Sequence, residues 1–259
     1  MEIYWFEQIA ADVPAGEDWL SAIEADHLHK LRFAKRRADW LLGRWTAKNA
    51  VAMFLGIRRE PLTLHSIEIR PDSSGAPKVF LENTPAETAI SLSHRSGIGM
   101  CAVAPAGVSL GCDLETIEPH GDAFPADYFT AEEQALVAGA PTIPDSLRSL
   151  TLVWSAKESA LKALGEGLRL DTRSVVLRLR EPFETPVESR QDFSPPSVFR
   201  NPSSPQAMNW RPLQVHYGHD VVFHGWWSQS AFFLRTLVSL PAAEPPILLH
   251  PDLRVSVPL

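Results

Sequence analysis

Cysteine is scarce in this sequence, which contains only Cys101 and Cys112 among its 259 residues. Each lies in an apolar run, so we expect two buried thiols in a reducing compartment rather than a disulfide framework. The sequence also lacks any apolar run of the ~18 residues that a membrane span needs. Its first residues carry no basic segment of the kind that opens a signal peptide, so we expect a soluble, cytoplasmic protein.

Positive charge is not in excess either. The chain has 24 Lys and Arg against 31 Asp and Glu, which gives a net charge of −7. This balance argues against nucleic-acid binding driven by overall charge, although it leaves room for a local basic pocket. Apolar residues make up 45% and charged residues 21%, which is ordinary for a globular protein of one domain or two similar halves.

The spacing of apolar residues predicts an α+β protein, because strands and helices follow one another without a regular βαβ order. Helices are predicted over 17–31, 34–55, 130–138 and 147–164. Strands are predicted over 1–9, 67–70, 89–94, 99–104, 108–115, 174–180, 221–227 and 231–240.

Each half of the chain thus offers a long helix and a few strands, which predicts two lobes with a ligand site at their junction. We expect an N-terminal lobe over 1–107, a C-terminal lobe over 108–240 and an extended tail over 241–259. Residues 181–212 contain seven prolines and are predicted to form a loose connector within the C-terminal lobe.

Three carboxylates stand out from this background. Asp113 and Glu115 are two residues apart on a predicted strand, so both point to one face, where their repulsion favours a cation between them. Glu158 lies in a predicted helix between Lys157 and Lys162. Three carboxylates can hold a hard divalent cation, and the lysines can hold phosphates attracted to it. Taken singly, a solvated strand end and an i,i+4 surface pair fit these residues as well.

Two further groups suit a phosphate ligand. Ser93-His94-Arg95 ends a predicted strand, where a histidine can donate to a phosphate or take a proton and an arginine can bind the phosphate. Arg37, Arg44 and Lys48 share one face of the predicted helix 34–55. A turn histidine and a solvated helix face remain the alternatives for these two groups.

A series of motifs in this chain resembles those of the 4′-phosphopantetheinyl transferases, and most closely the large, monomeric, surfactin-synthetase-activating type. The resemblance covers roughly residues 30–180, and its last two motifs are the most specific. In order, the motifs are Gly43-Arg44, Gly75-x-Pro77, Ser93-His94, Gly111-x-Asp113-x-Glu115 and Trp154-x-x-Lys157-Glu158-x-x-x-Lys162. The resemblance implies two pseudo-repeated lobes, each with a small antiparallel sheet and a long helix.

The resemblance also implies a reaction, in which coenzyme A (CoA) donates its 4′-phosphopantetheine arm to a serine of an apo-carrier protein and leaves adenosine 3′,5′-bisphosphate. Asp113, Glu115 and Glu158 match ligands of Mg²⁺ or Mn²⁺, and Glu158 also matches the proposed general base. The matches to residues around CoA are Lys157 and Lys162 beside the pyrophosphate, Ser93 and His94 at a phosphate, Arg37, Arg44 and Lys48 near the 3′-phosphate, and Gly75, Pro77 and Lys78 near the adenine.

This sequence departs from the family pattern at two positions. Arg95 stands where many relatives have serine, and Cys112 stands where a branched aliphatic residue is usual. We expect a monomer whose carrier protein docks near Phe124–Leu136. A Mg²⁺-dependent phosphohydrolase of a nucleotide-like ligand and a non-catalytic CoA- or carrier-binding module are the competing interpretations. Retention of the three acids and both lysines argues against the second of these.

Overall fold

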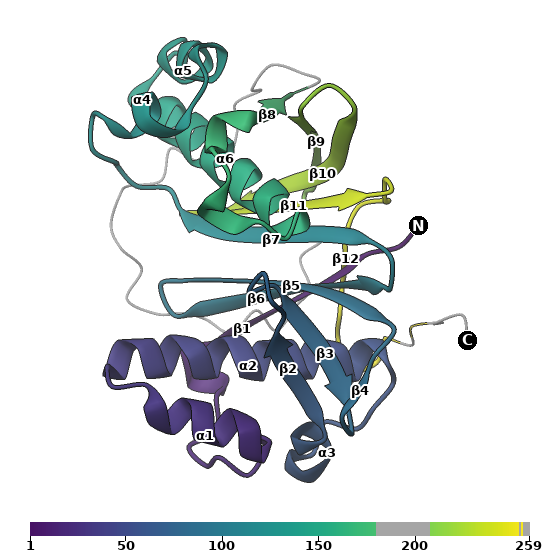
Figure 1. Ribbon diagram of the computed structural model, residues 1–259. Helices are drawn as coiled ribbons and strands as arrows, with labels where there is room; N and C mark the ends of the chain where they lie inside the picture. Colours follow the sequence, from purple (N-terminus) through teal and green to yellow (C-terminus); the bar gives the residue numbers. More distant parts are fainter. Residues whose placement is uncertain (180–207, 254, 256–259) are drawn as a thin grey trace.

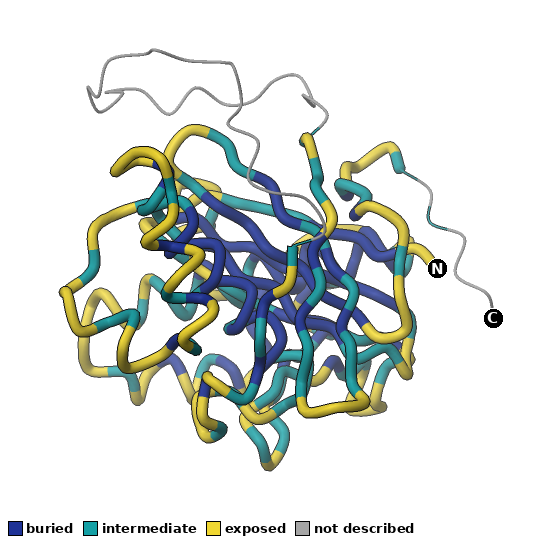
Figure 2. The backbone as a smooth tube through the Cα atoms, turned by 90° about the horizontal axis from the view of Figure 1, so that it is seen from above, coloured by how far each residue is buried: buried dark blue, intermediate teal, exposed yellow. Residues whose placement is uncertain are grey.

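Two sheets, one in each lobe, face each other across the middle of the molecule (Figure 1). The computed structural model describes residues 1–179, 208–253 and 255. Apolar side chains from the facing sheets form a shared core that includes Trp5 and Met100 from one sheet and Cys112, Leu114 and Leu237 from the other. This core lies at the centre of the molecule, where the backbone is most deeply buried (Figure 2).

The N-terminal lobe has a four-stranded sheet in the order β12-β1-β6-β5, and a small sheet, β2-β3-β4, beside it. Its long helix α2 packs against the larger sheet. The elements of this lobe are β1 (Tyr4–Ile9), the 3-10 turn Ala10–Asp12, α1 (Ala22–Lys30), α2 (Ala34–Phe54), α3 (Pro61–His65), β2 (Ile67–Pro71), β3 (Pro77–Leu81), β4 (Thr84–Pro85), β5 (Thr88–Arg95) and β6 (Ile98–Pro105).

The C-terminal lobe has a five-stranded antiparallel sheet in the order β7-β11-β10-β9-β8, covered on one face by α6. Its elements are β7 (Ser109–Thr116), α4 (Phe124–Tyr128), α5 (Ala131–Ala138), α6 (Ile143–Ala163), the 3-10 turns Gly167–Arg169 and Thr172–Ser174, β8 (Val175–Arg178), β9 (Arg211–Tyr217), β10 (Val221–Ser230) and β11 (Phe233–Leu240). The chain then returns to the first lobe, where β12 (Ile247–Leu248) pairs in parallel with β1.

Both lobes are built around the same buried ion pair. In each, a capping box opens a short helix, and its glutamate lies next to a fully buried lysine of the long helix. Glu24 Oε2 is 2.5 Å from Lys48 Nζ, and Glu133 Oε2 is 2.7 Å from Lys157 Nζ. The sequence separation within the two pairs is the same. The pseudo-repeat therefore extends to individual buried contacts.

Each glutamate also ties its lobe's helices to the chain beyond them. The second carboxylate oxygen of Glu24 accepts a hydrogen bond from the Ile69 amide, and that of Glu133 accepts one from the Leu177 amide. Each lysine donates to two backbone carbonyls as well. A buried charge pair is tolerated only when its remaining hydrogen-bonding capacity is met, and these contacts meet it.

The α+β class predicted from the sequence is confirmed, and most predicted elements are present within a few residues of their expected ends. Helix α6 begins earlier than predicted because the Thr142 side chain caps it and Pro144 is accommodated in the first turn. The predicted connector 181–212 lies largely outside the described residues, although β9 already begins at Arg211. None of the described helices combines the length and the apolar character that a membrane span needs.

Helix α6 approaches β7 so closely at Gly111 that no other residue fits there. A Cβ atom on Gly111 would lie 1.8 Å from the Ser159 carbonyl oxygen. The missing side chain lets the helix lie directly on the strand that carries Asp113 and Glu115. The distance between the helix and these acids therefore depends on this glycine.

Gly111→Ala should lower the free energy of unfolding by about 3 kcal/mol, because the helix must move away from the strand. Gly43→Ala is the matched control. A Cβ at Gly43 meets nothing within 4 Å, so alanine should stabilise α2 by about 0.5–1 kcal/mol. Urea denaturation measures both values. An unchanged unfolding midpoint in Gly111→Ala would contradict this packing.

Candidate active site

The acidic side chains meet where the two lobes touch. Asp113 and Glu115 lie on β7, and Glu158 lies on α6, the helix that covers this strand. Asp113 is 2% exposed, and its Oδ2 atom is buried without a hydrogen-bond partner, whereas Oδ1 accepts from Ser93 and Lys162, each at 2.8 Å. One oxygen of a buried carboxylate therefore remains available for a cation.

The mutual proximity of the acids shows in their pKa values. Burial, together with the charges of Asp113 and Glu158, raises the pKa of Glu115 to about 7, although Arg95 and a hydrogen bond from Trp154 oppose the shift. Burial and Asp113 also raise the pKa of Glu158, against the effect of Lys162. Carboxylates with raised pKa values gain from a cation placed among them.

Lys162 is the basic group closest to the acids. Its Nζ donates to the Cys112 carbonyl oxygen at 3.1 Å and to Asp113, and it lies 3.7 Å from Glu158 Oε2. Although burial lowers the pKa of Lys162, the charges of Asp113 and Glu158 raise it overall, so the side chain is cationic at neutral pH. Part of the side chain remains exposed to the adjacent cavity.

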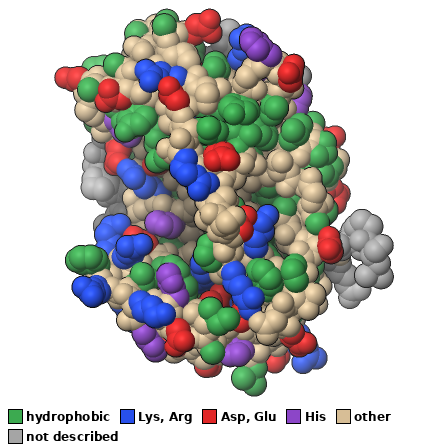
Figure 3. Space-filling view, in the orientation of Figure 1, with side chains coloured by type: hydrophobic (Ala, Val, Ile, Leu, Met, Phe, Trp, Pro, Cys, Tyr) green, Lys and Arg blue, Asp and Glu red, His purple; other side chains and the backbone are tan. Residues whose placement is uncertain are grey.

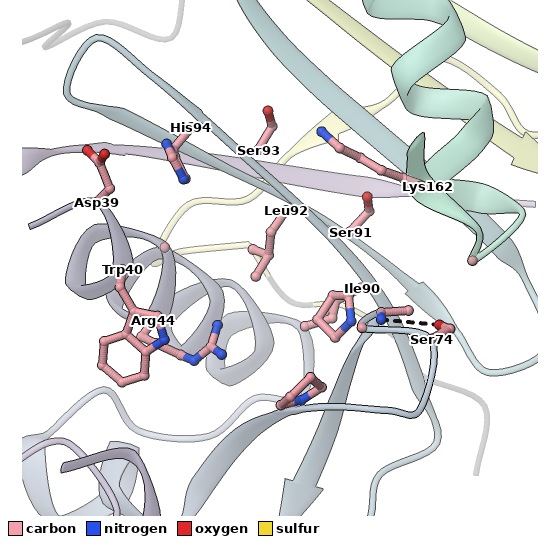
Figure 4. A pocket seen from close by; sticks show the side chains of 17 residues that line it. Asp39, Trp40, Arg44, Ser74, Ile90, Ser91, Leu92, Ser93, His94 and Lys162 are labelled. Atoms are coloured by element: carbon pink, nitrogen blue, oxygen red, sulfur yellow. Dashed lines mark hydrogen bonds between the residues drawn. The ribbon is translucent and has the colours of Figure 1, made fainter. Parts of the chain in front are cut away.

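A cavity of about 410 Å³ runs from Lys162 toward α2, between the two lobes. Figure 4 shows Lys162 on one side of it, Ser91, Ser93 and His94 along β5, and Trp40 and Arg44 on the opposite side. The glycine-containing turn between β2 and β3 closes one end through Ser74, Gly75, Ala76 and Pro77. The space-filling view shows Lys and Arg side chains on both sides of the hollow between the lobes (Figure 3).

Two further hollows continue this cavity. One of about 340 Å³ shares Lys162 and the 74–77 turn with it and extends to Lys78 and Glu166. The other, of about 420 Å³, shares Asp39, Trp40 and His94 and extends to Lys35 and Arg36. Together they form an elongated cleft that suits a long ligand with several charged groups better than a small round one.

Arg44 is held toward this cleft by its neighbours. Its guanidinium lies 4.9 Å from the centre of the Trp40 ring, and its Nε is 3.9 Å from Glu24 Oε1. His94 stands at the rim, where partial enclosure of the ring lowers its pKa; Asp39 opposes this shift and Lys162 adds to it. His94 is therefore largely neutral near pH 7 and can donate one hydrogen bond and accept another.

Comparisons with known proteins show which family this chain resembles. Residues 109–201 match the model of the 4′-phosphopantetheinyl transferase superfamily. A holo-[acyl-carrier-protein] synthase of Streptococcus equi subsp. zooepidemicus is 31% identical over 101 residues, an alignment that covers 32% of this chain and 86% of that protein. The chain belongs to the 4′-phosphopantetheinyl transferase superfamily.

Other relatives carry the same name over shorter or more distant matches. A holo-[acyl-carrier-protein] synthase of Streptococcus agalactiae is 35% identical over 69 residues, which is 27% of this chain and only 58% of that protein. A holo-(acyl-carrier-protein) synthase structure from Bacillus anthracis, in complex with CoA (3′,5′-ADP), has a TM-score of 0.33 at 22% identity and covers 39% of this chain and 92% of that one. Since that score is low, the family assignment rests on the sequence matches.

Several residues that the family resemblance singled out lie in the cleft of this superfamily member. They are Arg44, Gly75, Pro77, Ser93, His94 and Lys162, with Lys78 in the adjoining hollow. Sequence reasoning missed Asp39, Trp40 and Ser91, which also line the cleft. Asp39 and Trp40 lie one turn before Arg44 on the same helix, and Ser91 precedes Ser93 by the strand period, so both periods offered a signal.

The predicted phosphate role of Lys157 is wrong. Its side chain is fully buried, and its ammonium lies against Glu133 and donates to the Thr172 and Val175 carbonyl oxygens. Burial lowers its pKa, which Glu133 partly restores. Lys48 is contradicted in the same way, because its buried ammonium lies against Glu24 rather than near the cleft. Both lysines hold their lobes together and cannot touch a ligand.

Two predicted arginines point elsewhere as well. Arg37 donates to the Leu28 carbonyl oxygen and is not among the residues that line the cleft. Arg95 turns away from the cleft toward Glu115 and Glu118. The three predicted metal ligands do not form a closed metal site in this structure. In the described part of the chain, no group of three His, Cys, Asp or Glu side chains is arranged to hold a metal ion.

Lys157→Met should cost about 3–5 kcal/mol of folding free energy, because it leaves the Glu133 charge buried and unpaired. The double variant Glu133→Gln/Lys157→Met should recover most of this loss. Lys78→Met, at a side chain that is 60% exposed, is the control and should change stability little. Chemical denaturation compares the four proteins. If Lys157→Met kept wild-type stability, the structural role assigned to Lys157 would fail.

Proposed function

We propose that this protein transfers the 4′-phosphopantetheine arm of CoA to a serine hydroxyl of an apo-carrier protein and releases adenosine 3′,5′-bisphosphate. Membership of the superfamily supports this proposal. The observation that carries it is the meeting of Asp113, Glu158 and Lys162 at one side of an elongated cleft whose other side presents Arg44. We further propose that the chain is a monomer of the surfactin-synthetase-activating type.

The charges along the cleft match the charges along CoA. Arg44, oriented over Trp40, is suited to the 3′-phosphate, and the turn containing Gly75 and Pro77 lies beside it for the adenosine end. Lys162 lies farther along, where the diphosphate would follow. There its fixed positive charge would stabilise the bisphosphate that departs.

The acidic residues fit a divalent cation in their chemistry. Mg²⁺ prefers carboxylate oxygens, and Asp113 Oδ2 is a buried carboxylate oxygen without a partner. Asp113, Glu115 and Glu158 would hold the ion after a small rearrangement, since they do not form a closed site here. When bound, the cation would neutralise charge on the CoA diphosphate.

Glu158, which matches the general base proposed for the family, is the proposed base for the serine proton. Its raised pKa brings a carboxylate closer to the neutral range in which proton transfer is most effective. In the proposed step Glu158 takes the hydroxyl proton, the serine oxygen forms a bond to the β-phosphorus of CoA, and the bond from that phosphorus to the bridging oxygen of the diphosphate breaks. Lys162, whose ammonium lies 3.7 Å from Glu158 Oε2, would balance the negative charge that develops on the departing bisphosphate.

The carrier protein is proposed to dock beside α4, near Phe124–Leu136. The rings of Phe124 and Tyr128 lie 5.0 and 5.1 Å from that of Trp154, and Tyr128 is 36% exposed. Trp154 also donates a hydrogen bond to Glu115, so this aromatic cluster adjoins the acidic site. A carrier bound there would bring its serine near Glu158.

Mass spectrometry of an apo-carrier protein incubated with CoA, Mg²⁺ and this protein should show the added mass of phosphopantetheine. Chelation of Mg²⁺ and the substitution Asp113→Asn should each abolish the gain, because the charge on the diphosphate would no longer be balanced. Release of phosphopantetheine without any carrier would support the phosphohydrolase instead. Intact CoA binding with no transfer to any of a panel of carriers would refute the transferase function.

Arg44→Ala should weaken CoA binding at least about tenfold, because it removes a charge-assisted contact to a phosphate. Arg37→Ala is the control on the same helix face and should leave the affinity unchanged, since Arg37 does not line the cleft. Isothermal titration of CoA compares the two variants. Equal losses in both would place the 3′-phosphate outside the cleft.

A further inference from the structure

Arg95 occupies a distinctive position next to the acidic residues. It lies two residues after Ser93 on β5, so the two side chains share a face of the strand. Ser93 donates to Asp113, and Arg95 Nε lies 3.3 Å from Glu115 Oε2. Two successive residues of one face of β5 thus contact the two acids of β7, each across the lobe junction.

The guanidinium of Arg95 has further partners at the end of β7 and just beyond it. Its Nε donates to Thr116 Oγ1 at 3.1 Å, and its NH2 group pairs with Glu118. Arginine stays charged at every accessible pH. Glu115 is thus held by a permanent cation of the protein, whereas Asp113 keeps one buried oxygen without a partner.

A divalent cation bound to Glu115 Oε2 would share or replace this contact. Its positive charge would also be repelled by the guanidinium a few ångströms away. Glu118 offers Arg95 an anionic partner that does not depend on Glu115, so Arg95 can release Glu115 without losing every counter-charge. The three carboxylates do not form a closed metal site. This agrees with the contacts that Arg95 already makes to Glu115 and Lys162 to Glu158.

We infer that Arg95 is the resident counter-cation of Glu115 and that it lowers the affinity of the acidic residues for divalent cations by competing for this carboxylate. Arg95 is therefore a positioning residue that sets how readily the metal site closes. This inference rests on the proposed function to the extent that the acidic residues bind a divalent cation.

Titration with Mn²⁺, followed by electron paramagnetic resonance of the free ion, tests the competition without measuring transfer. Arg95→Ser should bind Mn²⁺ about tenfold more tightly than the wild type, the size expected for removing one unit charge near a partly exposed site. Arg95→Met, which keeps the bulk of the side chain, should tighten binding to a similar extent. Arg58→Ser, at a side chain that is 83% exposed, should bind like the wild type.

Circular dichroism establishes that each variant is folded before the titration. If the wild type binds Mn²⁺ and both folded Arg95 variants bind it no more tightly than the wild type, the inference is overturned. Absence of Mn²⁺ binding to the wild type, with and without CoA, would instead remove the metal from the proposed function and the inference with it. The two failures are therefore distinguishable.

Discussion

A buried glutamate–lysine pair determines how the long helix sits in each lobe. In the C-terminal lobe, the pair between Glu133 and Lys157 ties α6 to α5 and, through the Leu177 amide, to β8. Since successive residues of a helix point about 100° apart, directing Lys157 into the lobe turns Glu158 and Lys162 toward the junction. The orientation of the site residues is thus set by a contact that no ligand touches.

The same pair in the N-terminal lobe does not produce a second site. There Glu24 and Lys48 anchor α2, which presents Trp40 and Arg44 to the cleft, with Asp39 as its one carboxylate there, rather than a cluster of acids. The pseudo-repeat therefore supplies two similar supports with different outward faces. The outward face of α6 carries Glu158 and Lys162, and that of α2 carries Arg44. The hydrogen bond from the Cys112 amide to Ser91 Oγ helps to hold the lobes in register.

The sequence predicts helices and strands well where the spacing of residues within one element determines which side chains share a face. The two-residue spacing of Asp113 and Glu115 and the four-residue spacing of Glu158 and Lys162 place these residues correctly, because strand and helix periods are local properties. The prediction that Lys157 and Lys48 contact CoA is wrong, because a sequence motif does not show which of its residues faces the core. The partners of Arg95 depend on a strand from the other lobe, so local patterns cannot reveal them.

In the proposed function, both lobes bind one CoA molecule across their junction. Hydrogen–deuterium exchange with and without CoA and Mg²⁺ tests it most directly. Exchange should slow in both lobes together, at the turn around Gly75 and just after α6 near Gly165, because these two segments line the same cavity. Protection confined to one lobe, or protection only at surfaces away from the cleft, would show that CoA does not bind across the junction.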